Sequence, residues 1–188
     1  MKDTSILTGK GIRTGAEYIA GLQDDREIWT QGKRVKDVTS EPGMSRGVSS
    51  LAGFLDNQHN DKYRDKVTYV DEDGIRCPLS FKTPKSKQDI LDRGKAYYEW
   101  ATWSHGMFGR TPDYKNASLM SFAAARSFLD QGTKGNAEFS KNMLDFYNYA
   151  RTNDQILTHT LINLSLSHKQ AAAGIYNDQL ALHVRKKT

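Results

Sequence analysis

The stretch SHGMFGRTPDY, residues 104–114, separates two long helical patterns and decides how the chain is laid out. Gly109 can adopt backbone angles that other residues avoid, and Pro112 fixes its own φ and keeps the residue before it extended. These two residues describe a tight connection between helices. A tight connection does not require Arg110 or Tyr114, so the stretch raises the question of a bound ligand.

Arg110 and Tyr114 bring chemistry that suits a binding site. A guanidinium group is a permanent cation with five donors in one plane, which suits anions and flat polar rings. The phenol of Tyr114 can both donate and accept a hydrogen bond. Asp113 has a simpler role available, as the cap of a helix expected from about Asn116. The residue types alone leave both interpretations open, a plain turn or a ligand site.

Helical periodicity dominates the region around this turn. Behind Pro84, the spacing predicts a long helix from Ser86 to about Met107, whose recurring positions are Ile90, Tyr97, Trp100, Ala101, Ser104 and Phe108. A second helix is expected over about 116–129. A third is expected from about 136 to 151, with one side formed by Phe139, Met143, Phe146 and Ala150.

The first half of the chain predicts two hairpins and two more helices. Residues 26–38 read as short β runs around a Gln-Gly turn, and residues 67–79 as a second hairpin with an Asp-Gly turn. Thr14 and Glu17 have the spacing of a capping box and predict a short helix over 14–22. A helix over 45–57 has one apolar face, which consists of Val48, Leu51, Phe54 and Leu55.

The last part of the chain has a different sequence pattern. Residues 156–164 alternate and are β-branched, which favours an extended segment, residues 165–178 resemble a linker, and residues 179–184 read as a strand. Because one strand is not stable without partners, we expect a mostly α domain at 1–155, followed at 156–188 by the start of a β-domain. The chain is therefore expected to be a piece of a larger protein.

Composition excludes several classes of function. The 188 residues carry a net charge of +5, but the 27 Lys and Arg are spread along the chain, which favours a solvated surface over nucleic-acid binding. The single cysteine, Cys77, excludes a metal or iron–sulfur site built from several cysteines of this chain. No signal peptide or membrane-spanning run is present, so we expect a soluble cytoplasmic protein without a metal.

His159 is the second candidate for chemistry. In an extended LTHTL its side chain shares a face with Leu157 and Leu161, whereas Thr158 points the other way. A histidine on an apolar face is either a satisfied core residue or a reactive group. The sequence contains no dinucleotide-binding, phosphate-loop, zinc-protease or serine-hydrolase motif. Motifs of these kinds therefore do not decide whether His159 is a core residue or a reactive group.

Three segments together resemble one known family. They are TGAEYIAGLQDDREIWTQGKRVKDVTSEPG at 14–43, WATWSHGMFGRTPDY at 100–114 and FYNYARTNDQILTHTLIN at 146–163. Their order and motifs are similar to the N-terminal portion of the oxygenase component of two-component 4-hydroxyphenylacetate 3-monooxygenases. A related branch, 4-hydroxybutyryl-CoA dehydratase, needs cysteines for an iron–sulfur cluster, and the helix before the turn has none.

The resemblance implies an acyl-CoA-dehydrogenase-like fold, with N-terminal helices, a middle β-domain and a C-terminal bundle that builds a homotetramer. It implies FAD as cofactor, supplied in reduced form by a separate NAD(P)H-dependent flavin reductase. With O2 the flavin forms a C4a-hydroperoxide, which hydroxylates a phenol such as 4-hydroxyphenylacetate next to its hydroxyl group. The 188-residue chain alone is expected to be inactive, and the alternative is a non-catalytic helical fragment or interaction module without a complete flavin site.

The resemblance also assigns roles to residues. Arg110, Tyr114 and His159 are expected to face the substrate and to take part in catalysis, and Arg110, Thr158 and His159 to contact the cofactor. His159 can favour the phenolate form of the substrate, Arg110 can supply fixed positive charge, and Tyr114 can orient the phenol.

Overall fold

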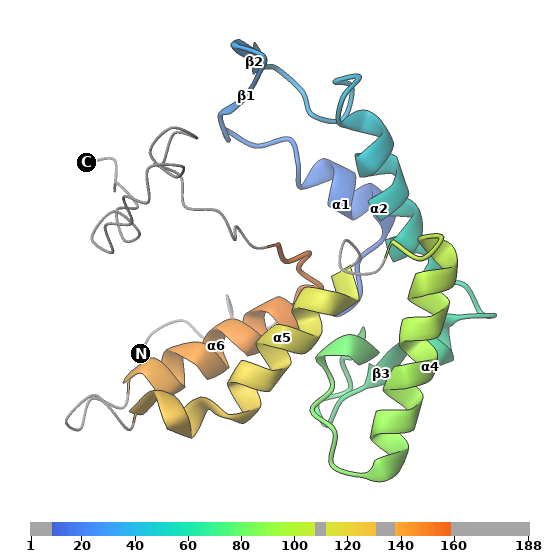
Figure 1. Cartoon of the computed structure of the whole chain (residues 1–188), viewed down its shortest axis with the longest axis vertical. Coiled ribbons are helices and arrows are strands. Elements are labelled where there is room, and N and C mark those ends of the chain that lie inside the picture. The colour runs from blue at the N-terminus through green and yellow to red at the C-terminus, as the bar shows by residue number, and fades with distance from the viewer. Residues whose placement is uncertain (1–8, 108–111, 131–137, 159–188) are drawn as a thin grey trace, which may run out of the picture. The chain divides into compact units, whose positions relative to one another are not determined.

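The computed structural model describes residues 9–107, 112–130 and 138–158. By its contacts the chain divides between Leu157 and Thr158, and the fold described below is that of the first unit. This unit is mainly helical and carries two separate antiparallel hairpins, which confirms the predicted fold class (Figure 1). The strands predicted within 159–188 lie outside the described residues, so the boundary at 155/156 stays a prediction.

The described elements follow one another in the order of the bar in Figure 1. The helices are α1 Gly15–Ala20, α2 Ser45–Asn57, α3 Arg64–Val67, α4 Lys87–Trp103, α5 Pro112–Ala124 and α6 Glu138–Thr152. The strands are β1 Ile28–Thr30, β2 Lys33–Val35, β3 Thr68–Val70 and β4 Arg76–Pro78, and the short 3-10 helices are η2 Leu79–Phe81 and η3 Arg126–Asp130.

The helix α1 begins with the predicted capping box. The hydroxyl of Thr14 accepts a hydrogen bond from the backbone N–H of Glu17 at 3.2 Å, and the Glu17 carboxylate accepts one from the N–H of Thr14 at 2.8 Å. The next residue, Gly15, donates its N–H to Asp56 of α2 at 2.7 Å. A Cβ at Gly15 would lie 2.6 Å from the carbonyl oxygen of Ala52, so only glycine permits this close packing of α1 on α2.

Both predicted hairpins are present. In the first, Gln31 and Gly32 both have positive φ, at 49° and 74°, which is the geometry of a two-residue type I′ turn. In the second, the carboxylate of Asp71 accepts hydrogen bonds from the backbone N–H groups of Asp73 and Ile75, and Gly74 has φ 80°. The Asp-Gly turn thus forms where the sequence predicted it.

The long helix α4 is shorter than predicted. It starts after Ser86, whose hydroxyl accepts from the N–H of Asp89 at 3.1 Å, but it ends at Trp103 instead of about Met107. His105 and Gly106 both take positive φ, at 51° and 80°, and the Gly106 N–H bonds back to Ala101 at 2.8 Å. This left-handed end stops the helix before the turn.

The helix α5 starts earlier than predicted. It begins at Pro112 and not near Asn116, because proline has the right φ for a first helical position and needs no hydrogen bond there. Asp113 therefore lies inside the first turn, so its predicted role as N-cap is wrong. At the other end, α5 stops at Ala124 and the chain continues as the tighter η3 instead of the predicted α-helix to Leu129.

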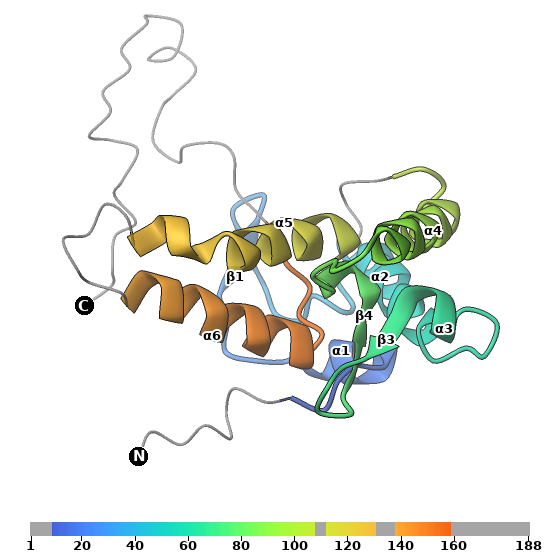
Figure 2. The same ribbon diagram turned by 90° about the horizontal axis from the view of Figure 1, so that it is seen from below.

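Two buried clusters hold the unit together, and η2 contributes to both. One lies between η2, α5 and α6 and contains Phe81, Leu119, Met120, Ala123, Tyr147 and Ala150. The helices α5 and α6 run side by side in both views (Figures 1 and 2). The other lies between α3, η2 and α4 and contains Val67, Leu79 and Ala96. The 3-10 turn thus joins the α5–α6 pair to α3 and α4.

The predicted apolar faces are partly wrong. Ile90 of α4 is 61% exposed, and Phe139 and Phe146 of α6 are 54% and 49% exposed. Ala150 is buried and Met143 packs against the core, as predicted. The buried side of α6 extends from them to Tyr147, whose hydroxyl donates to the Phe81 carbonyl at 2.6 Å. The helical spacing was predicted correctly. Spacing alone does not tell which of two overlapping stripes of side chains faces the core.

Candidate functional site

The largest cavity near the turn is a groove between α2 and the C-terminal end of α4. It has a volume of about 820 Å³ and runs along residues 103–107, the last described residues before the turn. Its apolar wall comes from Leu51 and Phe54 of α2 and from Trp103 and Met107. We call this cavity the α2–α4 groove.

Local sequence explains the shape of the α2–α4 groove. Gly47 and Gly53 line it, and a Cβ at either position would meet nothing within 4 Å, so α2 presents a side without bulk. Trp103 is held by edge-to-face contacts with Trp100 and Tyr63, each with ring centroids 5.1 Å apart. Polar groups at the groove come from Ser50, Asn57 and His105, among others. The groove therefore combines a flat aromatic wall with a few hydrogen-bonding groups.

The structure describes only two of the four predicted site residues. Arg110 and His159 lie outside the described residues. Tyr114, in the first turn of α5, is 40% exposed and lines a smaller recess of about 280 Å³ together with Tyr97 of α4. Thr158 is exposed. Neither Tyr114 nor Thr158 lines the α2–α4 groove, so the convergence of the predicted residues on one cavity stays a prediction.

Residues 9–13 lie across the end of α6, a contact that no motif predicted. The backbone oxygen of Thr152 accepts from the N–H of Gly11 at 2.8 Å, and the Thr152 hydroxyl accepts from the N–H of Gly9 at 2.9 Å. A Cβ at Gly9 would lie 2.1 Å from the Thr152 oxygen, and Gly11 has φ 96°. The spaced glycines were the available signal, because both positions admit only glycine.

Asp154 is the buried polar centre of this junction. Its carboxylate accepts from the N–H of Arg13 at 3.1 Å and from the Gln58 amide at 2.8 Å, and its backbone oxygen accepts two bonds from the Arg13 guanidinium. Burial raises the pKa of Asp154 above its ordinary value, although these hydrogen bonds work against the rise. Asp154 also has φ 44°, in the left-handed region. It fixes the point from which residues 155–158 leave α6.

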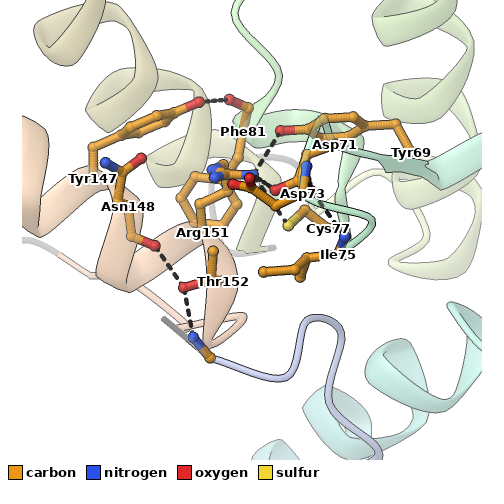
Figure 3. Close-up of polar contacts among 11 residues, drawn as sticks. Tyr69, Asp71, Asp73, Ile75, Cys77, Phe81, Tyr147, Asn148, Arg151 and Thr152 are labelled. Carbon is orange, nitrogen blue, oxygen red and sulfur yellow. Dashed lines mark hydrogen bonds and ion pairs between the residues drawn. The ribbon is translucent and has the colours of Figure 1, made fainter. Parts of the chain in front are cut away.

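Arg151 connects α6 to the second hairpin, as Figure 3 shows. Its Nη1 donates to the carboxylate of Asp71, and it also lies 3.4 Å from the Tyr69 hydroxyl and 3.4 Å from Cys77 Sγ. The side chains of Arg151 and Asp71 are only 12% and 9% exposed, so solvent screens this pair little. Arg151 and Asp154 both lie in the segment 146–163 that carries the resemblance, but the resemblance gave neither residue this role.

Burial and this ion pair set the proton affinities around Arg151. Burial works to raise the pKa of Asp71, but the hydrogen bonds from Arg151 and from the Ile75 backbone outweigh it and hold that pKa below its usual range. Burial raises the pKa of the Cys77 thiol to about 12, so the thiol is neutral and unreactive near neutral pH. Hence this cluster fixes structure and does not supply a nucleophile.

The comparison with known protein families agrees with the resemblance. The sequence profile of the family described as "4-hydroxyphenylacetate 3-hydroxylase N terminal" matches residues 14–188. The chain belongs to this family.

Relatives of the 4-hydroxyphenylacetate 3-hydroxylase family cover most of the chain. The 4-hydroxyphenylacetate 3-monooxygenase oxygenase component of Thermus thermophilus is 37% identical over 94% of this chain. That of Klebsiella oxytoca is 33% identical over 84%, and a pyoverdin chromophore biosynthetic protein of Pseudomonas aeruginosa is 30% identical over 94%. The chain spans 35%, 30% and 33% of the length of these three relatives, in that order.

Solved structures give the same family and fold. A crystal structure of the 4-hydroxyphenylacetate 3-monooxygenase oxygenase component complexed with FAD and 4-hydroxyphenylacetate matches with a TM-score of 0.74 and 39% identity, over 86% of this chain and 33% of that one. An archaeal 4-hydroxybutyryl-CoA dehydratase from N. maritimus shares the fold at 16% identity and a TM-score of 0.64. No helix in the described ranges combines the length and apolar character needed to cross a membrane.

Proposed function

We propose that this chain is the N-terminal part of a monooxygenase that uses reduced FAD and O2 to hydroxylate a phenol beside its existing hydroxyl group. The observation that carries this proposal is the match to an oxygenase component whose crystal structure contains both FAD and 4-hydroxyphenylacetate. The name of that relative, an oxygenase component, supports a separate flavin reductase as partner. A homotetramer remains a prediction from the resemblance, and a cytoplasmic location remains a prediction from the composition.

The described residues fit part of a flavin site. Pockets for small molecules typically measure about 300–1,000 Å³ and are mostly apolar with a few polar groups. The α2–α4 groove has this size and an aromatic wall that includes Trp103. When bound in reduced form, FAD supplies the electrons and activates the oxygen.

The protein side chains orient and polarise the substrate in this proposal. His159 hydrogen-bonds the phenol oxygen and favours its ionised form, which makes the neighbouring ring carbon more nucleophilic. Arg110 places a permanent positive charge beside the phenolate, where exclusion of water strengthens its effect. Tyr114 holds the substrate through its hydroxyl group and aromatic ring.

The test is product formation by the full-length protein that contains this chain. With reduced FAD, O2 and 4-hydroxyphenylacetate, we expect the corresponding catechol, detected by chromatography. Arg110→Ala and His159→Ala should each lower its rate of formation by about 100-fold or more, because each removes a group that acts on the reacting phenol.

Matched controls are available on the described surface. Arg46 in the first turn of α2 and His59 just after α2 are both exposed and do not line the α2–α4 groove. Arg46→Ala and His59→Ala should leave catechol formation unchanged. Normal rates in both Arg110→Ala and His159→Ala would refute the assigned roles, and absence of catechol from the unmodified protein would refute the proposed reaction.

One observation favours the alternative, a helical module that does not bind flavin by itself. Large apolar side chains of α5, η3 and α6 are exposed, namely Phe122, Phe128, Phe139 and Phe146, as expected of a body that another body covers. Thermal unfolding of the 188-residue chain with saturating FAD separates the two ideas. A cooperative transition without a shift supports the module, and a higher melting temperature supports a flavin site within this chain.

A further inference from the structure

A continuous row of aromatic rings leads from the α2–α4 groove to the protein surface. Trp103 forms part of the groove wall, and Tyr63, the residue before α3, lies against it with ring centroids 5.1 Å apart. Trp100 contacts the other side of Trp103, also at 5.1 Å, and Phe54 contacts Trp100 at 5.9 Å. Trp103 is thus the only member of this row that touches both the groove and a tyrosine in the described contacts.

We propose that Trp103 and Tyr63 form a one-electron relay that carries an oxidising equivalent out of the groove to the surface. Indole and phenol are the side chains that strong one-electron oxidants attack most readily, after thiols. The single thiol, Cys77, is fully buried and has no contact with this row among those described. Phenylalanine is far harder to oxidise, so Phe54 closes the row on the other side.

The environment of Trp103 suits a residue that passes an electron on. Its indole Nε1 is buried and has no hydrogen-bond acceptor among the described residues, and the same holds for Trp100. An oxidised indole normally passes this proton to an acceptor. Because no described protein group accepts it, oxidised Trp103 returns to its resting state by taking a single electron from a neighbouring ring.

The environment of Tyr63 suits the end of the relay. Its ring is partly exposed, so the phenolic proton can leave to solvent. The ammonium groups of Lys62 and Lys66 lie 4.9 Å and 5.8 Å from the ring centroid. These two positive charges disfavour a positively charged ring. The product is therefore a neutral phenoxyl radical at the surface.

The step balances without a further reagent. An oxygen-derived radical that accepts a single electron, such as a peroxyl radical, takes one electron from Trp103 in the groove and becomes the peroxide anion. Trp103 regains an electron from Tyr63, which releases its phenolic proton to water. The net change is one oxidant reduced, one tyrosine converted to a phenoxyl radical and one proton released.

The relay is an activity separate from the proposed hydroxylation. It protects the protein when an activated oxygen species escapes before it reacts with the substrate. A protein that activates oxygen and loses the activated species before reaction exposes its own groove to oxidation. Transfer to a surface tyrosine moves the damage to a place where small reductants can repair it. The test below uses no flavin, so its result does not depend on whether the hydroxylation proposal is correct.

Pulse radiolysis with azide radicals tests the relay on the chain itself, because these radicals oxidise tryptophan selectively. The measurement is made in a Trp29→Phe background, since Trp29 is exposed and the only other tryptophans are Trp100 and Trp103. We expect the absorbance of a tryptophan radical to convert to that of a phenoxyl radical in a first-order step, at a rate independent of protein concentration.

Tyr63→Phe is the decisive variant, because it keeps the ring contact with Trp103 and removes only the hydroxyl group. It should slow the conversion by more than an order of magnitude. Tyr98→Phe is the matched control, because Tyr98 of α4 is 74% exposed and outside the row, and it should not change the rate. Equal rates in Tyr63→Phe and its parent, with unchanged melting temperatures, would overturn the proposal, as would a rate proportional to protein concentration.

Discussion

At the scale of single residues, a few buried polar side chains matter more than the exposed charges. Arg151, Asp71 and Asp154 join segments that are far apart in sequence, whereas Lys85 and Glu72 form a pair with side chains 79% and 92% exposed. Exposed pairs contribute about 0–1 kcal/mol to stability, because solvent screens them. Removing one partner of a buried pair leaves an uncompensated charge and costs several times more.

We expect Asp71→Asn to lower the free energy of unfolding by about 3 kcal/mol at neutral pH, measured by urea denaturation. The pKa of Asp71 is depressed in the folded state, so the pair stabilises the protein above the ordinary carboxyl pKa of about 3.9 and is lost as the pH falls through the lower folded-state pKa. The difference between wild type and Asp71→Asn should therefore shrink from about pH 6 towards about pH 2.

The neighbouring Glu72 provides the control for this prediction. Its carboxylate is almost fully exposed, so Glu72→Gln should change the free energy of unfolding by no more than about 0.5 kcal/mol at any pH in this range. A pH-independent effect of Asp71→Asn would mean that the substitution acts through the turn hydrogen bonds and not through the charge of the pair.

At the scale of elements, the chain's start and the helix ends are set by backbone geometry. Gly11 takes φ 96° where the chain passes over β4, and a Cβ there would lie 2.4 Å from the backbone oxygen of Arg76. Gly94, inside α4, takes no positive φ, and a Cβ there would meet nothing within 4 Å. The two glycines therefore have opposite meaning, one required by the fold and one tolerated by it.

Replacing each glycine by alanine tests this difference. Gly11→Ala should lower the free energy of unfolding by about 2 kcal/mol or more, because it combines an unfavourable φ with a backbone collision. Gly94→Ala should raise it by roughly 0.5–1 kcal/mol, because alanine has the higher helix propensity and fits the open space. Both values can be read from denaturant titrations, and a neutral Gly11→Ala would show that the chain's start does not bind as described.

At the scale of the whole described unit, contacts between distant segments make folding cooperative. The segment at residues 9–13 is bonded to α6 across more than 140 positions of sequence, and the second hairpin to α6 across about 80. Cys77 lies at this junction and is completely buried. Its thiol should become accessible only when the junction opens.

Thiol labelling measures that opening. With a chromogenic disulfide reagent at about pH 8, we expect native Cys77 to react orders of magnitude more slowly than the unfolded chain, because the folded pKa of about 12 and the burial suppress the thiolate. The rate should rise with urea in parallel with global unfolding. The control is Thr102→Cys in a Cys77→Ala background, which places a thiol on the exposed side of α4 and should react at once. Equally fast reaction of native Cys77 would contradict the described burial.

The sequence by itself determined the local elements and the family. The capping box, both hairpin turns and the helix at 45–57 were predictable, because each depends on backbone preferences within a few residues. Motifs in a fixed order indicated the family. The same motifs pointed to Arg110 and His159 as candidate site residues. That their side chains meet at one cavity remains a prediction.

Only the tertiary structure decided which faces are buried and what holds residues 9–13 against the end of α6. Phe139 and Phe146 were expected in the core, but the Tyr147 side of α6 is buried because its hydroxyl meets the Phe81 carbonyl. Asp154 carries no local signal of its role, since its partners Arg13 and Gln58 are contributed by segments far away in sequence. Periodicity counts turns along one helix, whereas burial and hydrogen-bond partners depend on what the rest of the chain places opposite it.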